Sequence, residues 1–372
     1  MIALKDVRRL IDTDTGESAV MSLYLDMSVN SDNKRTWGIF LSQQRARFDE
    51  LDSDNGRREP VARILTRVQN WIDEEFRPGN RGVAIFATLD GSWFEALQFP
   101  VRVENRLVIG ERPLVWPLRE LVESSRRHAI VLVDRRRMRV LTVCMSTVED
   151  ELLIEKEEYP ANHDVQAGGE AAKDHQKRKA EEARAFFREF AAELQDYQRR
   201  WKPDAWVLLG THENTTHFRE FLPQPIADAV VHVAAAGVDE PAPTIIGRLS
   251  DFFDMHTLRA RAESIDQLRE RVRTGHFAVA GIDDALEQLQ EGKVETLVIA
   301  RGLDSSGGQC TKCGFVLARR SGGCPYCGGE VRDGIDLAES MVRIATTQEA
   351  DVAFVESDVM RDLEGVGALL RF

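Results

Sequence analysis

Four of the five cysteines lie within eighteen residues, in two Cys-x-x-Cys pairs formed by Cys310 with Cys313 and by Cys324 with Cys327. A glycine follows each pair directly and allows backbone amides to turn toward the sulfurs. Four thiolates satisfy tetrahedral zinc fully and leave no open coordination position. The spacing therefore predicts a structural zinc site, and iron in a rubredoxin-like site is the main alternative.

A second candidate for chemistry is the polar loop 161–170, which ends in Gly168, Gly169 and Glu170. The residues after it are good helix formers, and neither Gly nor Pro interrupts them before Pro203. Apolar residues recur there at steps of three and four, as in Phe186, Phe190 and Leu194, which is typical of one buried helical stripe. The pattern predicts a flexible loop that leads into a long helix over residues 170–202.

Basic residues gather at two places, the first turns of this helix and a predicted hairpin. They are Lys173, Lys177, Arg178 and Lys179 on the helix, and Arg135, Arg136 and Arg137 at the hairpin. Charges of this kind are costly to place in a core, so we expect them to be exposed. They form either a phosphate-binding surface or a solvated face that keeps the protein in solution.

Other polar residues are assigned structural roles. Cys144 lies in an apolar strand and is expected to behave as a buried small hydrophobic residue. His212 and His217 lack a third ligand nearby and are interpreted as polar loop residues. The segment 307–309, Gly-Gly-Gln, is interpreted as a flexible lead-in to the cysteine cluster.

The totals describe a protein of the cytoplasm. A length of 372 residues suggests two or three domains, and no apolar run approaches the ~18 residues of a membrane span. The N-terminus has no signal-peptide pattern, and in a reducing cytosol clustered cysteines favour metal over disulfides. A net charge of −13 argues against non-specific coating of nucleic acid but allows local basic patches to contact a large RNA–protein partner.

The remaining pattern predicts three α/β regions, residues 1–124, 125–262 and 263–372. The first combines helices with a hairpin of strands 82–88 and 93–99, and it shows no catalytic constellation. The second places strands around the loop and the long helix. The third alternates helices and strands around a zinc ribbon at residues 308–330.

Residues 277–300 and the ending 365–372 resemble the C-terminal domain of archaeal and eukaryotic class-one peptide-release factors and of Pelota. Archaeal members look similar in placing a zinc ribbon inside this domain. The second region resembles the family's middle domain through residues 128–134, the long helix and residues 202–210, which implies an RNase-H-like core. The resemblance covers about residues 127–372 and is to the divergent bacterial and archaeal branch that includes Balon-like hibernation factors.

This resemblance implies a monomeric ribosome-binding factor whose partners are ribosomal RNA, peptidyl-tRNA and a translational GTPase. The family's Gly-Gly-Gln loop orients water at the peptidyl-tRNA ester, whereas this loop reads Gly168, Gly169, Glu170. An ionised carboxylate only accepts hydrogen bonds. Hydrolysis would therefore require that Glu170 position the water in this way, or that Gln166 or Gln176 substitute by a shifted register. The first region lacks an Asn-Ile-Lys-Ser motif, so stop-codon reading is not expected.

Three hypotheses follow from these residues. The chain is a rescue or release-like factor that hydrolyses peptidyl-tRNA, a non-hydrolytic hibernation factor that occupies the ribosomal A site, or a protein–protein adaptor unrelated to the ribosome. The basic start of the long helix would face ribosomal RNA in the first two.

Overall fold

The computed structural model describes residues 2–29, 35–51, 56–155, 170–319 and 322–372. For residues 51, 170–180, 182 and 183 it describes only the backbone. Two compact units are present: Ser125–Met255, and Met1–Ser124 together with His256–Phe372. The predicted α/β architecture with several sheets is confirmed. The first and third predicted regions both lie in the larger unit, and the boundaries at 124 and 262 stay predictions. Within the described ranges, every helix is too short or too polar to span a lipid bilayer.

The smaller unit is a mixed five-stranded sheet with the order β7-β6-β5-β8-β9. Its strands are β5 (His128–Val133), β6 (Arg137–Cys144), β7 (Thr147–Glu155), β8 (Ala205–Gly210) and β9 (Val230–Ala234). Strands β5 to β7 form an antiparallel meander, whereas β8 runs parallel to both β5 and β9. A parallel neighbour requires a crossover, and helix α5 (Glu170–Trp201) supplies it between β7 and β8.

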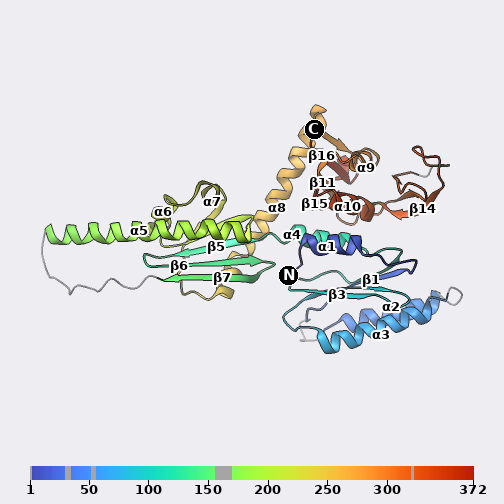
Figure 1. Cartoon of the computed structure of the whole chain (residues 1–372), viewed down its shortest axis with the longest axis horizontal. Coiled ribbons are helices and arrows are strands. Elements are labelled where there is room, and N and C mark those ends of the chain that lie inside the picture. Colours follow the sequence, from blue (N-terminus) through green and yellow to red (C-terminus); the bar gives the residue numbers. More distant parts are fainter. Residues whose placement is uncertain (1, 30–34, 52–55, 156–169, 320–321) are drawn as a thin grey trace. The chain divides into compact units, whose positions relative to one another are not determined.

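Helices cover both faces of this sheet. Helix α5, drawn in green in Figure 1, buries Phe187, Phe190 and Leu194 against one face, as the helical spacing predicted. Helices α6 (His212–Arg219) and α7 (Gln224–Asp228) add to that side. The first turns of α8 (Ala242–Thr274) cover the other face through Ile245 and Leu249. Burial on both faces explains the nearly continuous apolar strands.

The larger unit begins with an antiparallel sheet of order β3-β2-β1-β4. Its elements are α1 (Leu4–Asp12), β1 (Val20–Asp26), α2 (Trp37–Leu51), α3 (Arg58–Glu75), β2 (Gly82–Thr88), β3 (Phe94–Phe99), β4 (Arg106–Gly110) and α4 (Trp116–Ser124). Helices α2 and α3 lie on one face of the sheet (Figure 1), where Leu41 and Leu65 join its core. The predicted hairpin of β2 and β3 is confirmed.

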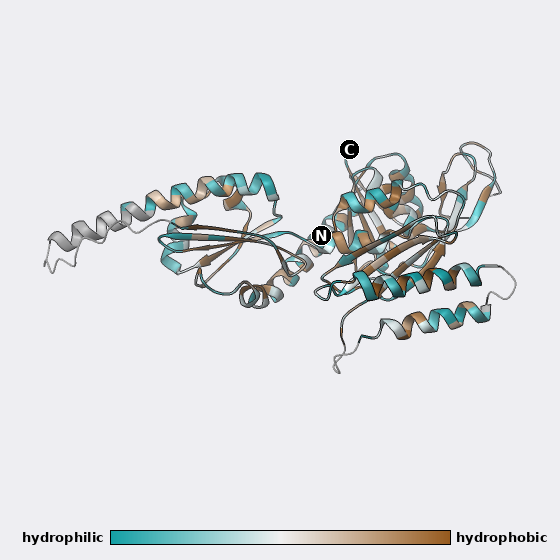
Figure 2. Cartoon of the chain, turned by 60° about the horizontal axis from the view of Figure 1, so that its bottom comes forward, coloured by the Kyte–Doolittle hydropathy of each residue, from teal (hydrophilic) through white to brown (hydrophobic). Residues whose placement is uncertain are grey.

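The C-terminal part contributes a sheet of order β10-β16-β11-β15 and a ribbon sheet of order β13-β12-β14. Their elements are β10 (Ala278–Ala280), α9 (Ile282–Gln290), β11 (Val294–Ala300), β12 (Ser306–Cys310), β13 (Val316–Leu317), β14 (Val331–Asp336), α10 (Leu337–Thr347), β15 (Asp351–Val355), η1 (Arg361–Leu363) and β16 (Val366–Leu370). The ribbon is inserted between β11 and α10. Figure 2 shows hydrophobic residues gathered on the strands of the sheets and hydrophilic residues on outer faces of the helices.

Two local predictions are wrong. His212 and His217 lie in helix α6 rather than in a loop, because the Thr211 hydroxyl accepts the Asn214 amide and starts the helix early. The segment 307–309 is not a flexible lead-in but part of β12, the central ribbon strand. A side chain at Gly307 would lie 2.2 Å from the carbonyl oxygen of Leu317, so this glycine allows close strand packing.

Candidate functional site

The four clustered cysteines converge at the end of the ribbon. Their sulfur atoms all lie within 4.8 Å of one another. The Sγ atoms of Cys310 and Cys327 are 3.5 Å apart, and those of Cys313 and Cys324 are 3.6 Å apart. Sulfurs at ~2.3 Å from one tetrahedral ion would lie ~3.8 Å from each other. The four cysteines can therefore hold one metal ion, as their spacing predicted.

Backbone amides support the first cysteine pair. The N–H groups of Lys312 and Cys313 donate to Sγ of Cys310 over 3.4 and 3.5 Å. These N–H donors stabilise the thiolate and lower the pKa of Cys310 to about 6, and the hydrogen bond from Cys313 makes the largest contribution. The thiolate is the form that binds metal, so the fold prepares this sulfur for coordination.

Three glycines shape the two cysteine turns. Gly314 has φ +74° and Gly328 has φ +69°, a left-handed conformation that glycine adopts readily. Their amides donate to the carbonyl oxygens of the first cysteine of each pair, Cys310 and Cys324, over 3.0 and 2.9 Å. A Cβ atom at Gly329 would lie 3.0 Å from the Cys310 sulfur, so the backbone there lies directly against the metal ligands.

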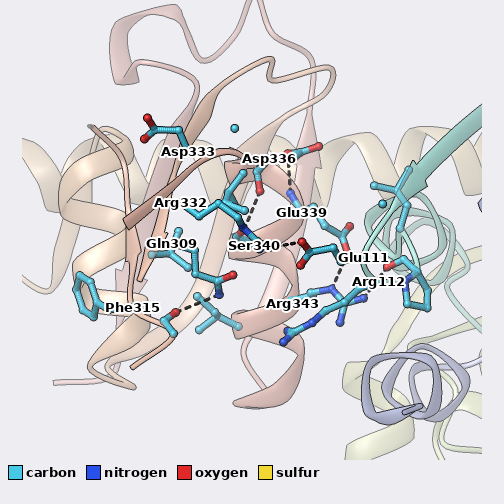
Figure 3. A pocket seen from close by; sticks show the side chains of 18 of the residues that line it. Glu111, Arg112, Gln309, Phe315, Arg332, Asp333, Asp336, Glu339, Ser340 and Arg343 are labelled. Carbon is cyan, nitrogen blue, oxygen red and sulfur yellow. Dashed lines mark hydrogen bonds and ion pairs between the residues drawn. The ribbon is translucent and has the colours of Figure 1, made fainter. Parts of the chain in front are cut away.

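A cleft of about 760 Å³ lies beside the ribbon within the larger unit. Figure 3 shows its polar lining, with Phe315 on the ribbon side and Arg112 across from it. An ion pair between Arg332 of β14 and Glu111 joins the two walls and lowers the pKa of the Glu111 carboxyl.

Glu339 lines this cleft and was not identified from the sequence (Figure 3). Its carboxylate accepts the amides of Val115 and Trp116, at the start of α4, at 3.0 and 2.9 Å. Arg343 donates to it over 2.8 Å and also donates to the Pro113 carbonyl. Burial raises the pKa of Glu339 to about 7. The pair therefore fastens helix α10 to α4. The i,i+4 spacing of Glu339 and Arg343 was visible in the sequence. Nothing near them in the sequence indicated that Glu339 contacts Val115 and Trp116, more than 220 residues away.

The arginines of the middle hairpin already have carboxylate partners. Arg135 pairs with Glu213 at 2.9 Å. Arg137 pairs with Asp239 at 2.6 Å and with Asp134 at 3.1 Å, and the hydrogen bonds that it donates to these carboxylates raise the pKa of Arg137. Arg136 is exposed beside them, so the run is at the surface, as predicted. Its role in binding RNA stays a prediction.

Part of the predicted catalytic loop lies outside the described residues. This applies to Gln166, Gly168 and Gly169. The backbone places Glu170 at the first position of α5 and the other candidate residues on its first turns. The side chains of these residues lie outside the described part of the structure. These are Lys173, Gln176, Lys177, Arg178 and Lys179. The predicted helix is confirmed, and the chemistry assigned to its start stays a prediction.

Over its middle, the chain is release-factor-like. Residues 113–251 match the model of the bacterial archaeo-eukaryotic release factor family 10. This match confirms the resemblance to release factors, and it spans the loop, α5 and the five-stranded sheet. None of the curated proteins compared with the chain matches it.

Solved structures of translation factors align with the chain at low similarity. An archaeal translation termination factor, aRF1, is 16% identical, with 100% of this chain and 99% of that chain covered and a TM-score of 0.28. The Thermoplasma acidophilum Pelota protein is 12% identical over 100% and 94%, with a TM-score of 0.28. Dom34 of S. cerevisiae, described as a translation termination-like factor interacting with Hbs1, is 9% identical over 78% and 79%, with a TM-score of 0.43.

Proposed function

We propose that this chain is a ribosome-binding translation factor of the release-factor and Pelota type. It acts in ribosome rescue or in release-like hydrolysis of peptidyl-tRNA, without reading stop codons. The match of residues 113–251 to a release-factor family carries the proposal. The matched stretch contains both the Gly168, Gly169, Glu170 loop and the helix that follows it.

Helix α5 is anchored in the core by residues that lie well after its first turn, which supports a role for the preceding loop at a distance from the core. Phe187 is the first buried residue among the described side chains of this helix, and Phe190 and Leu194 follow it into the core. Phe187 lies seventeen positions after Glu170, which is ~25 Å of helix at ~1.5 Å rise per residue. The helix can therefore carry the loop well away from the sheet. Lys173, Lys177, Arg178 and Lys179 would contact phosphates of ribosomal RNA along this length.

In the hydrolytic form of the proposal, the loop orients one water at the ester that joins peptide to tRNA. The water oxygen bonds to the ester carbonyl carbon, the bond to the ribose oxygen breaks, and a water proton passes to that oxygen. Gly168 and Gly169 would allow close approach of the backbone, and Glu170, or Gln166 or Gln176 in a shifted register, would hold the water.

A non-hydrolytic factor that occupies the A site is the second candidate. The acidic Glu170 favours it, because a carboxylate cannot donate a hydrogen bond and would lie among RNA phosphates. In that case the loop fills the site without orienting water.

The metal in the four-cysteine site would be zinc in a structural role. Among the residues that the structure describes, the four cysteines are the only ligands gathered there and form a closed donor set, so the ion would stabilise the ribbon rather than bind substrate. A translational GTPase partner, cytoplasmic location and monomeric state complete the proposal.

Replacement of Glu170 by Gln separates the two candidates. The test measures release of labelled peptide from ribosomes loaded with peptidyl-tRNA, with occupancy measured in the same sample. Release that increases in Glu170→Gln shows a site that the carboxylate impairs, whereas full occupancy without release supports the occupying factor. Glu181→Gln, an exposed glutamate further along α5, is the matched control and should leave both readings unchanged.

A further inference from the structure

The two cysteine turns of the ribbon place different residues at equivalent positions. Lys312 stands directly before the second cysteine of the first pair, and Tyr326 stands directly before the second cysteine of the other pair. Both side chains are exposed, and 60% of Tyr326 is open to solvent. A Cβ atom at Gly329, three residues after Tyr326, would lie 2.9 Å from Cβ of Lys312. The lysine therefore lies next to the turn that carries the tyrosine.

The Tyr326 ring is supported from one side. Its centroid lies 4.0 Å from that of Phe315, with 40° between the ring planes. Phe315 is partly buried and lies two residues after Cys313, while Tyr326 directly precedes Cys327, so both aromatic residues adjoin the cysteine cluster in sequence. This contact restrains the tyrosine but leaves most of it uncovered. A fixed aromatic ring of this kind can receive a second flat group at low entropic cost.

Lys312 differs from the other described cations of the ribbon. Arg319 pairs with Asp283 at 3.0 Å, and Arg332 pairs with Glu111. Across the part of the chain that the structure describes, no carboxylate pairs with Lys312. The ribbon thus presents an exposed ring on one cysteine turn and, on the neighbouring turn, an exposed lysine that is available to an anion.

We propose that Phe315 and Tyr326 form a stacking platform for an unpaired RNA base and that Lys312 contacts an adjoining phosphate. A flat apolar base beside a negative charge is the chemistry that a ring and an unpaired ammonium complement, and stacking of this kind is tolerant of sequence. The inference deepens the proposed function, on which the choice of RNA as the partner rests. It gives the factor a second RNA contact, on the ribbon.

Binding of a short fluorescent single-stranded RNA to the full-length, metal-loaded protein tests the platform by anisotropy. Tyr326→Ala should weaken binding roughly 5- to 100-fold, while Tyr326→Phe should retain it. Lys312→Gln should reduce the slope of log affinity against log salt by about 0.7. Phe372→Ala removes an aromatic residue that is 69% exposed outside the ribbon and should change nothing. Metal content is measured for every variant.

An unchanged affinity in Tyr326→Ala with full metal content would overturn the platform. So would unchanged RNA binding together with weakened ribosome binding in that variant, because this result would assign the ring to a protein partner. The proposed function fails by a different result, which is wild-type protein that does not bind ribosomes. RNA binding and ribosome binding are measured in separate experiments, so the two failures can be distinguished.

Discussion

The cysteine ribbon and the arginine hairpin at residues 134–137 are both conspicuous clusters in the sequence. They differ in whether their side chains are paired with groups of opposite charge within the fold. In the ribbon, four thiols face one another, and backbone amides donate to Cys310 and favour its thiolate. In the hairpin, Arg135 and Arg137 already lie against Glu213, Asp134 and Asp239. The first cluster can hold a metal cation, whereas the arginines of the second are paired with carboxylates of the fold.

This difference gives a rule for the other charged clusters of the chain. Metal-binding or charged side chains that have no ion-pair partner within the fold indicate a bound ligand. Charged side chains that are paired within the fold are accounted for by their contribution to folding. Lys312 follows the first pattern, and the Glu339–Arg343 pair follows the second.

Removal of one metal ligand should have the largest effect. Cys310→Ser should lower bound zinc from about one equivalent to none, measured by mass spectrometry of the purified protein. Binding free energies of structural zinc are on the order of 10 kcal/mol, so the ribbon should lose its fold and become sensitive to protease. Cys144→Ser lies outside the cluster and should keep the metal. Equal zinc content in the two variants would remove the basis of the comparison.

Loss of the buried carboxylate at Glu339 should come next. Glu339→Ala leaves Arg343 and two amides of α4 without their acceptor, and both side chains of the pair are only 12–13% exposed. The free energy of unfolding should fall by about 3–5 kcal/mol in urea titration. Glu263→Ala breaks an exposed pair with Arg259 and should cost about 0.5 kcal/mol or less. Similar costs would show that the α10–α4 contact contributes little.

The same carboxyl should make stability depend on pH. Burial raises its pKa from about 4.5 to about 7, so the unfolded chain releases this proton at lower pH than the folded protein. The stabilisation is fully present below about pH 4.5 and is lost as pH rises through 7. Urea unfolding at pH 5 and pH 8 should show this decline in the native protein and a smaller one in Glu339→Gln. Parallel profiles would mean that Glu339 stays ionised in the fold.

The smallest effect is expected at the hairpin. Arg135→Gln removes one exposed ion pair, so stability should change by no more than about 1 kcal/mol. Its affinity for ribosomes should change less than that of Lys177→Gln on the first turns of α5. Sedimentation with ribosomes across a salt series measures both variants. A larger loss in Arg135→Gln would mean that paired arginines still bind RNA here.

Short-range patterns were the most predictable part of the molecule. The spacing of Cys310, Cys313, Cys324 and Cys327 predicted their convergence, because metal ligands two residues apart are fixed by one turn of backbone. The stripe that includes Phe190 and Leu194 predicted α5, because burial follows the 3.6-residue period.

Long-range contacts were not predictable from one sequence. Glu339 fastens α10 to Val115 and Trp116, and such a contact leaves no periodic signal in either segment. Gly307 looked flexible because glycine is common in loops, but its role is to let β12 pack closely between two strands. The ion pairs of Arg137 were equally unpredictable, since its partners include Asp239, about a hundred residues away.

The most direct test of the proposed function is peptide release from stalled ribosomes that carry labelled peptidyl-tRNA, at saturating protein and with ribosome occupancy measured in the same sample. We expect stoichiometric occupancy of the ribosomes and release above the uncatalysed background. Occupancy without release would favour the A-site-occupying factor over the hydrolase. Absence of occupancy would contradict the assignment to the ribosome and leave a protein–protein adaptor.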